Sequence, residues 1–124
     1  MIKLFSYGTL CEKDVQIREF GQEFYVEPDL DYVCGWDIIK CYIDDAYYNV
    51  AIPGEPVSIF SGAIVHIPEE LMPMVDEYEG EEYVRENIKT LSGLDCIMYV
   101  KRTYKKWNTI LKYQEEDAKH LFSN

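Results

Sequence analysis

The chain has 124 residues and a formal net charge of −11 at pH 7, with 48% hydrophobic and 28% charged residues. This length suits one domain with its own core and is too short for two, so residues 1–124 are expected to form a single domain. A protein this acidic is repelled by phosphate backbones and anionic lipids, which makes nucleic acid and membranes poor partners.

Composition leads to three further expectations. The 11 tyrosines favour a β-rich domain, because tyrosine fits pleated, half-buried surfaces. The sequence has no apolar run of membrane-spanning length and no signal pattern at its start, which predicts a cytoplasmic protein. The four cysteines lack CxxC spacing, and the two histidines lie far from them and from each other. No metal site is therefore expected.

The first part of the chain predicts a strand, a helix and a connection. Residues 2–6 read as a short strand. Residues 12–20 carry spaced apolar side chains among charged ones and predict a short helix that ends at Gly21. Residues 24–31 include a proline and read as a connection.

The next part predicts strands that are broken by glycine and proline. Residues 32–42, YVCGWDIIKCY, are β-branched and aromatic, with Gly35 where a bulge or kink would fit. Residues 44–67 contain two strand-like runs that Pro-Gly and Glu-Pro pairs punctuate. His66 lies among apolar residues and is interpreted as a hydrogen-bonded histidine at a strand end.

Residues 67–80 change to a helical period. Their apolar side chains fall three and four positions apart, and Gly80 stands where a C-cap would. Pro73 interrupts this pattern, so either the helix begins near Leu71 or an initial turn is offset from the main helix.

The remainder predicts a β-hairpin and a closing helix. Residues 83–91 and 96–104 alternate around the turn SGLD, and residues 110–122 are loosely helical. About six short strands with two or three short helices are typical of a barrel or a strongly curved sheet.

The stretch LFSYGTL, residues 4–10, breaks a buried strand with a glycine. Gly8 frees the backbone to take a positive φ and lets a ligand approach closely. Thr9 adds a hydroxyl, and successive amides in such a turn can form an anion-binding nest. The GxxxxGK[ST] pattern of a P-loop is absent. By itself this pattern favours an ordinary turn over a ligand-binding loop.

The stretch VDEYEGEEYVRENI, residues 75–88, is strongly acidic, and a solvated helix end is its simplest interpretation. Glu79, however, stands next to Gly80 where helix gives way to strand, so its side chain can turn toward a cavity if Tyr78 is buried. Partial desolvation and nearby like charges raise the pKa of such a carboxyl, which suits proton transfer near neutral pH. Arg85 is expected to anchor the segment through a bidentate pair with one of the acids.

Taken in order along the chain, four pieces resemble the γ-glutamylcyclotransferase-like, or AIG2-like, family. They are YGTL, NVAIPGEPVSIFSG, MVDEYEGEEYVR and MYV, and they extend from about residue 3 to residue 101. The resemblance implies an α+β fold, a small six-stranded mixed β-barrel with two or three flanking short helices. It also implies a substrate cavity at one mouth of that barrel.

The resemblance implies a reaction as well. It is that of a γ-glutamyl cyclotransferase, which releases 5-oxoproline from a small γ-glutamyl amine or γ-glutamyl amino acid without a cofactor or metal. By position, Tyr7, Gly8, Thr9 and Leu10 match the family's substrate-binding loop, and Glu79 matches its catalytic glutamate, the general acid and base. The expected partner is a small-molecule γ-glutamyl substrate, and the leaving amine and the oligomeric state stay open.

Two other functions remain open from the residues. The chain could be a non-catalytic binding module that retains the cavity, with Glu79 recognising an ammonium group. Thiol chemistry at Cys11, directly after the loop, is a further alternative, although no histidine lies near it in sequence.

The late part of the sequence adds tyrosines and a basic cluster. Some family members use a late tyrosine, and Tyr99, Tyr104 and Tyr113 are available for that role without a clear assignment. The basic cluster comprises Lys101, Arg102, Lys105 and Lys106. It is interpreted as a solvated strand end, with attraction of an acidic leaving group as the alternative.

Overall fold

The computed structural model describes residues 1–43 and 45–102. The predicted closing helix over residues 110–122 lies outside the described residues, as do Tyr104 and Tyr113 and the two later lysines of the basic cluster.

Within the described residues the chain forms eight strands, two α-helices and two short 3₁₀ turns. In order they are β1 (Ile2–Ser6), η1 (Thr9–Cys11), α1 (Lys13–Phe20), β2 (Tyr25–Val26), β3 (Asp31–Cys34), β4 (Trp36–Ile43), β5 (Ala46–Pro53), β6 (Ile59–Ile67), η2 (Glu69–Leu71), α2 (Met72–Glu79), β7 (Tyr83–Lys89) and β8 (Asp95–Lys101). The predicted strands and both predicted helices within this part are confirmed. The predicted connection over residues 24–31 contains a short strand, β2, that the sequence pattern did not indicate.

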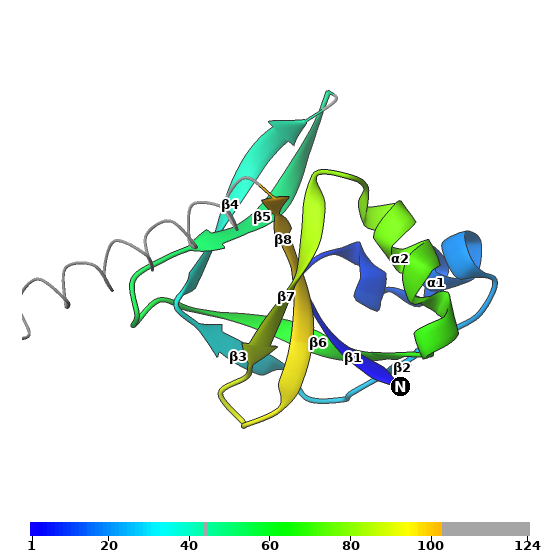
Figure 1. The fold of residues 1–124 in the computed structure, drawn as a ribbon, viewed down its shortest axis with the longest axis horizontal. Helices are drawn as coiled ribbons and strands as arrows, with labels where there is room; N and C mark the ends of the chain where they lie inside the picture. The colour runs from blue at the N-terminus through cyan, green and yellow to red at the C-terminus, as the bar shows by residue number, and fades with distance from the viewer. Residues whose placement is uncertain (44, 103–124) are drawn as a thin grey trace, which may run out of the picture.

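Six strands form one mixed sheet, in the order β2-β6-β1-β8-β7, with β3 also paired to β6. The first strand, β1, runs antiparallel to β6 and parallel to β8. The other two strands, β4 and β5, pair only with each other, and Figure 1 shows this hairpin projecting from the sheet. The predicted α+β class with a mixed sheet and short flanking helices is confirmed.

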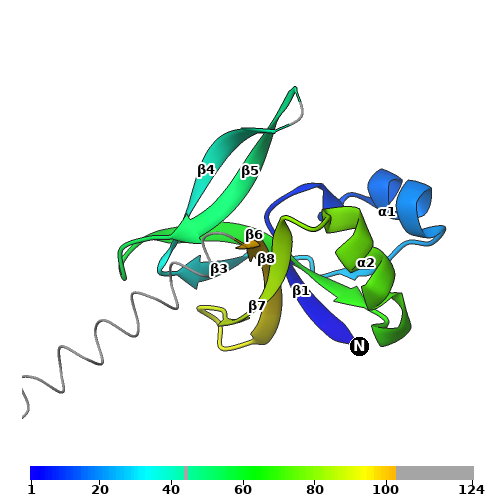
Figure 2. The same ribbon diagram turned by 45° about the horizontal axis from the view of Figure 1, so that its top comes forward.

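Gly35 separates β3 from β4 and thereby sends the hairpin away from the sheet (Figure 2). Its φ is +84°, in the left-handed region that favours glycine. The N–H of Gly35 donates to the carbonyl of Ser58 at 2.8 Å, and its own carbonyl accepts from the N–H of Gly54 at 2.9 Å. The kink predicted at this glycine is confirmed, and it divides the predicted strand 32–42 between two sheets.

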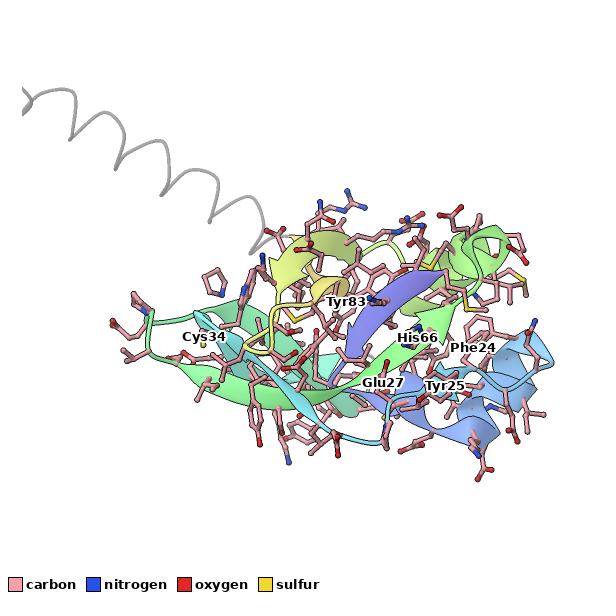
Figure 3. All side chains as sticks on the ribbon, turned by 90° about the horizontal axis from the view of Figure 1, so that it is seen from below. Phe24, Tyr25, Glu27, Cys34, His66 and Tyr83 are labelled. Atoms are coloured by element: carbon pink, nitrogen blue, oxygen red, sulfur yellow. The ribbon has the colours of Figure 1, made fainter. Side chains whose placement is uncertain are left out.

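The short strand β2 covers the edge of β6 near its end. Tyr25 is in register with His66, and the two rings lie 5.2 Å apart. The His66 Nε2 is 2.8 Å from Oε1 of Glu27, and Figure 3 shows the three side chains together. The interpretation of His66 as a hydrogen-bonded histidine at a strand end is confirmed.

The helices begin and end where local chemistry dictates. Gly21 caps α1 with a φ of +72° and donates its N–H to the carbonyl of Ile17 at 2.9 Å. Pro73 lies in the first turn of α2, where its missing N–H costs nothing. The 3₁₀ turn η2 precedes it, so the prediction of an offset initial turn is confirmed.

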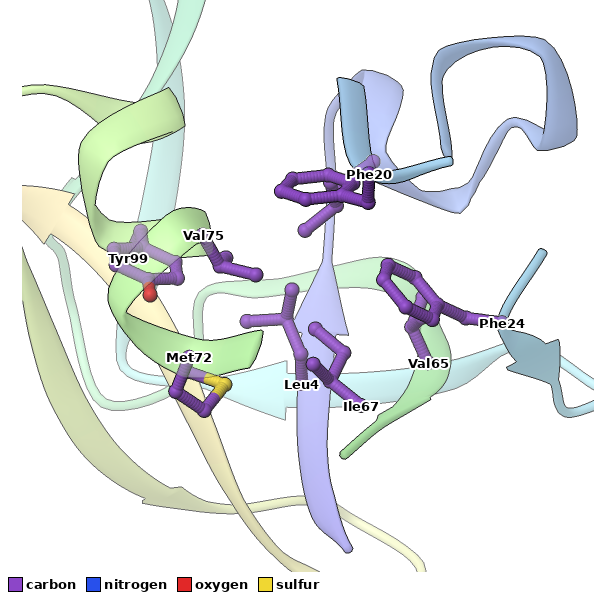
Figure 4. Packing of buried hydrophobic residues seen from close by; sticks show 9 residues of the cluster. Leu4, Phe20, Phe24, Val65, Ile67, Met72, Val75 and Tyr99 are labelled. Atoms are coloured by element: carbon purple, nitrogen blue, oxygen red, sulfur yellow. The ribbon is translucent and has the colours of Figure 1, made fainter. Parts of the chain in front are cut away.

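Both helices pack on one side of the sheet and bury its largest apolar cluster (Figure 4). Leu4 of β1 lies at the centre of this cluster, and α2 adds Met72 and Val75. The next residue along β1, Phe5, belongs to a second cluster with Met98, because side chains alternate between the faces of a strand. The strand β1 is therefore packed on both faces and is held firmly up to the point where the chain breaks into the loop.

None of the helices in the described part of the chain has the length and apolar character needed to cross a membrane.

Candidate active site

A cavity of about 550 Å³ opens where the loop after β1, the end of α2 and the hairpin β4–β5 come together. Figure 1 shows the end of β1 between the hairpin and the helices. The cavity is lined by Leu4, Phe5, Ser6, Tyr7, Gly8, Thr9, Leu10, Lys40, Tyr47, Tyr48, Asn49, Tyr78, Glu79, Tyr83 and Tyr99. All five residues predicted from the sequence to form the site therefore line the same cavity, although about seventy positions separate the loop from Glu79.

The loop of residues 7–10 lines this cavity. Among the described residues, no acceptor takes a hydrogen bond from the N–H of Gly8, Thr9 or Leu10. The buried Gln16 side chain holds the loop from behind, since its Nε2 donates to the Leu10 carbonyl at 2.8 Å. The loop therefore has three successive backbone donors for which the described residues provide no acceptor.

The expectation that Gly8 provides a positive φ is wrong. Its φ is −124°, and a Cβ placed at this position would meet nothing within 4 Å. Neither a positive φ nor a close neighbour therefore requires glycine here, and the missing side chain instead leaves free space at this cavity-lining position. What glycine provides here is access for another molecule rather than a special turn.

Tyr7 and Thr9 tie the loop to its neighbours. The Tyr7 hydroxyl donates to the Tyr99 carbonyl at 2.5 Å and accepts the N–H of Ala51 at 3.3 Å. Burial raises the pKa of the Tyr7 phenol well above its usual range, so it stays protonated. The Thr9 Oγ1 shares a 2.9 Å hydrogen bond with the hydroxyl of Tyr78 on α2. Tyr7 thus joins β1 to β8 and β5, and Thr9 joins the loop to the helix.

Glu79 is the last residue of α2 and its side chain is largely buried at the cavity. Burial, and next the negative charge of Asp76, raise the pKa of the Glu79 carboxyl to about 7. None of the described side-chain or backbone donors is hydrogen-bonded to this carboxylate. A carboxyl group with this pKa, free of donors from the described residues, can both accept and return a proton near neutral pH.

Asp76, one turn before Glu79, is in contrast held ionised. Its two oxygens accept hydrogen bonds from Nε and Nη2 of Arg85 at 2.9 and 2.6 Å, and the Tyr99 hydroxyl donates to Oδ1 at 2.6 Å. The Arg85 guanidinium, and with it the Tyr99 hydroxyl, keeps the pKa of Asp76 below its ordinary value. The bidentate pair predicted for Arg85 is confirmed, and it fixes the end of α2 against β7 and β8.

Four lining residues come from the projecting hairpin, and the sequence pattern did not indicate them. They are Lys40 on β4 and Tyr47, Tyr48 and Asn49 on β5. Tyr83 of β7 lines the cavity as well. Burial, and then the charges of Glu79, Cys41, Glu82 and Tyr48, raise the pKa of its phenol. The excess of tyrosine was the one signal in the sequence, and it could not indicate that these strands fold back over the loop.

The residues behind the other sequence-based alternatives lie away from the cavity lining. The Cys11 thiol donates to the Gly8 carbonyl at 3.3 Å and supports the loop from outside. In the basic cluster, Lys101 pairs with Glu82 at 3.8 Å, and the Arg102 Nε donates to the Glu81 carbonyl at 3.0 Å. Both basic side chains stabilise the start of β7, which agrees with their interpretation as a strand end.

Several solved structures share this fold at low sequence identity. One is a solution structure from Arabidopsis thaliana, with a TM-score of 0.66 and 14% identity over 97% of this chain and 81% of that one. A second, named gamma-glutamyl cyclotransferase, has a TM-score of 0.60 and 16% identity over 93% of this chain and 85% of that one. A crystal structure from Pyrococcus horikoshii has a TM-score of 0.58 and 17% identity over 82% and 78%. No curated protein sequence matches the chain.

The sequence itself matches the family model described as gamma-glutamyl cyclotransferase, AIG2-like, over residues 4–119. This match includes the loop after β1 and the acidic end of α2, which are the two segments that meet at the cavity. The chain belongs to the AIG2-like family of γ-glutamyl cyclotransferases.

Proposed function

We propose that the protein is a γ-glutamyl cyclotransferase that releases 5-oxoproline from a small γ-glutamyl amine or γ-glutamyl amino acid. One observation carries this proposal. The Glu79 carboxyl, desolvated and without a described donor, shares a cavity with the loop residues whose three successive amides have no described acceptor. A proton shuttle and an anion-binding backbone are the two parts that this reaction requires.

In the proposed reaction the substrate's own α-amino nitrogen attacks its γ-carbonyl carbon and closes a five-membered ring. A new C–N bond forms as Glu79 takes a proton from the ammonium group. The bond to the leaving amine then breaks, and Glu79 returns the same proton to that amine. The ring nitrogen sheds a second proton as it becomes an amide, and the released amine takes up one proton as it becomes an ammonium. The reaction is therefore balanced, requires no protein nucleophile and leaves Glu79 in its starting state.

The loop amides are assigned to the negative charge of the substrate. The N–H groups of Gly8, Thr9 and Leu10 would donate to the substrate carboxylate or to the oxyanion that develops on the γ-carbonyl. Binding the glutamyl chain in a folded conformation adds an intramolecular advantage, with effective molarities on the order of 10⁵ M or more in well-aligned cases. Positioning and proton transfer together would supply the rate enhancement.

The test measures 5-oxoproline after the full chain is incubated with γ-glutamyl amino acids and with γ-glutamyl-lysine isopeptides. Glu79→Gln keeps the shape of the side chain but removes the base, so the rate should fall by about 10²- to 10⁴-fold. The matched control is Glu77→Gln, an exposed carboxyl on the same helix that lies outside the cavity lining. Unchanged activity in Glu79→Gln would contradict the assignment of the base, and ligand binding without product would favour the non-catalytic module.

A further inference from the structure

We propose that Lys40 makes the leaving-group end of the cavity cationic, so that the enzyme prefers γ-glutamyl compounds whose leaving amine carries a carboxylate. This inference rests on the proposed cyclotransferase function of the same cavity. It adds a residue that selects the substrate, and this residue lies on the hairpin rather than on the loop or on α2.

The position of Lys40 follows from the register of the hairpin. Lys40 on β4 is directly opposite Asn49 on β5, and Tyr47 lies two residues from Asn49 along the same strand. Directly paired residues, and residues two apart on a strand, share one face of a sheet. All three line the cavity, and Tyr48, on the opposite face of the strand, lines it as well.

The hairpin and the loop both line the cavity and are attached to each other. The Ala51 N–H donates to the Tyr7 hydroxyl, which attaches β5 to the end of β1. Asn49 lies two residues before Ala51, roughly 7 Å along the strand, and Lys40 is across from it. Because the proposed reaction assigns the loop and Glu79 to the glutamyl group, we assign the part of the lining on the hairpin to the leaving amine.

Charge at the cavity singles out Lys40. Among the described lining residues, Lys40 is the one cation and Glu79 the one carboxyl. None of the ion pairs formed by described residues includes Lys40, whereas Lys101 already pairs with Glu82. Because the whole protein carries a charge of −11, a substrate carboxylate at this mouth would be repelled without a local cation. Lys40 therefore supplies the attraction for an acidic leaving group that the sequence left open to the basic cluster.

The effect of Lys40 on substrate preference should be moderate and should depend on the salt concentration. Lys40 is exposed, and a rim charge of this kind is partly screened by water and ions. It should therefore bias the choice between substrates rather than decide whether the reaction occurs. This separates its role from that of Glu79, whose loss should stop turnover with every substrate.

The experiment compares γ-glutamyl-alanine with γ-glutamyl-ethylamide, which differ only in the carboxylate of the leaving amine. Lys40→Met should lower kcat/KM for the alanine compound roughly three- to tenfold and leave the ethylamide within about twofold. Lys40→Arg should retain the preference because it keeps the cation. The matched control is Lys89→Met, which removes the same charge from an exposed position on β7 outside the cavity lining.

Raising the salt concentration from about 0.02 to 0.5 M should reduce the ratio of kcat/KM for the alanine compound to that for the ethylamide in the wild type. The same ratio in Lys40→Met should not change. The role of Lys40 would be overturned if Lys40→Met lowered kcat/KM equally for both substrates or left their kcat/KM ratio unchanged. It would also be overturned if Lys89→Met changed that ratio to the same extent. If neither compound yields 5-oxoproline, the proposed function fails, and calorimetric Kd values decide on Lys40. The role of Lys40 would be supported if the wild type bound the alanine compound more tightly than the ethylamide and Lys40→Met did not. Equal Kd values for the two compounds, or no binding of either, would overturn it.

Discussion

Glu79 and Asp76 show how two carboxyl groups one turn apart acquire opposite properties. Asp76 accepts hydrogen bonds from Arg85 and Tyr99, and its pKa is lowered. Glu79 is more buried than Asp76 and accepts no hydrogen bond from a described donor, and the pKa of its carboxyl is raised to about 7. The difference arises because hydrogen bonds stabilise the ionised form of one group, whereas desolvation destabilises the ionised form of the other. Only Glu79 is thereby suited to exchange a proton near neutral pH.

A stability measurement tests the environment of Glu79 without any substrate. Because its pKa rises on folding from 4.5 to about 7, the folded state binds more protons than the unfolded state between these values. Raising the pH through this window should therefore destabilise the wild type, by on the order of 2–3 kcal/mol at pH 8 relative to pH 4. Glu79→Gln should lack this loss and be more stable than the wild type at about pH 8, as measured by urea unfolding. Identical pH profiles for the two proteins would show that Glu79 is well solvated.

Gly8 offers a second test at the scale of one residue. Its negative φ and the open space where a Cβ would lie predict that Gly8→Ala folds with a change in unfolding free energy below about 1 kcal/mol. The added methyl group would occupy the cavity wall where the loop amides must approach a ligand. We expect KM for the substrate to rise about tenfold or more, since misplacement by about 1 Å is costly in such sites. A large loss of stability, or unchanged kinetics, would contradict this account of the glycine.

At the scale of elements, the junction between α2 and β7 positions the acid and base. Gly80 ends the helix with a φ of +91°, and its carbonyl accepts the Tyr83 N–H at 3.2 Å. The Arg85–Asp76 pair then holds the start of β7 against the helix. Because helix and strand are joined on both sides of the turn, Glu79 is kept at the cavity rather than in solvent.

This junction predicts an effect of Asp76 on the pH profile of the enzyme. Asp76→Asn removes the charge that helps to raise the pKa of Glu79 and leaves the Arg85 cation without that carboxylate nearby. Both changes lower the pKa of Glu79, so the acidic limb of kcat/KM should move to lower pH by up to about one unit. A pH–rate series for 5-oxoproline formation measures this shift. Glu77→Gln should leave the acidic limb of the kcat/KM profile in place. An acidic limb that does not move in Asp76→Asn would argue against electrostatic coupling between the carboxyls of Asp76 and Glu79.

For the whole molecule, the cavity depends on contacts between segments that are distant in the chain. The parallel pairing of β1 with β8 brings Tyr99 beside Tyr7, and the Tyr7 hydroxyl then reaches the backbone of β5. Thr9 in turn joins the loop to Tyr78 on α2. Three walls meet at one cavity because each is attached to the strongly buried strand β1 or to its neighbours.

The net charge of −11 gives a prediction for the whole protein. Self-repulsion among the carboxylates destabilises the compact state, and salt screens it. The Tm should therefore rise by roughly 2–5 °C between about 0.02 and 0.3 M sodium chloride at pH 8. A Tm that is constant or falls with salt would show that local ion pairs such as Arg85–Asp76 outweigh the overall repulsion.

Much of the fold could be predicted because its signals are local. Period-two and helical patterns identified the strands and helices, and Gly21 and Gly35 marked the end of α1 and the kink before β4. The short strand β2 could not be predicted, because two residues carry no periodic signal and depend on pairing with β6. Departure of the hairpin from the sheet also depends on tertiary contacts rather than on local preference.

The candidate site divides in the same way. By itself, the sequence determined the residue types of the loop and the acidic helix end, and their family resemblance linked Tyr7–Leu10 with Glu79. Only the tertiary structure brought them to one cavity, placed Lys40 and its neighbours on the opposite wall, and gave Gly8 an ordinary φ. The physical reason is range: backbone preferences act over a few residues, whereas burial, pKa shifts and cavity walls arise from segments that meet only after folding.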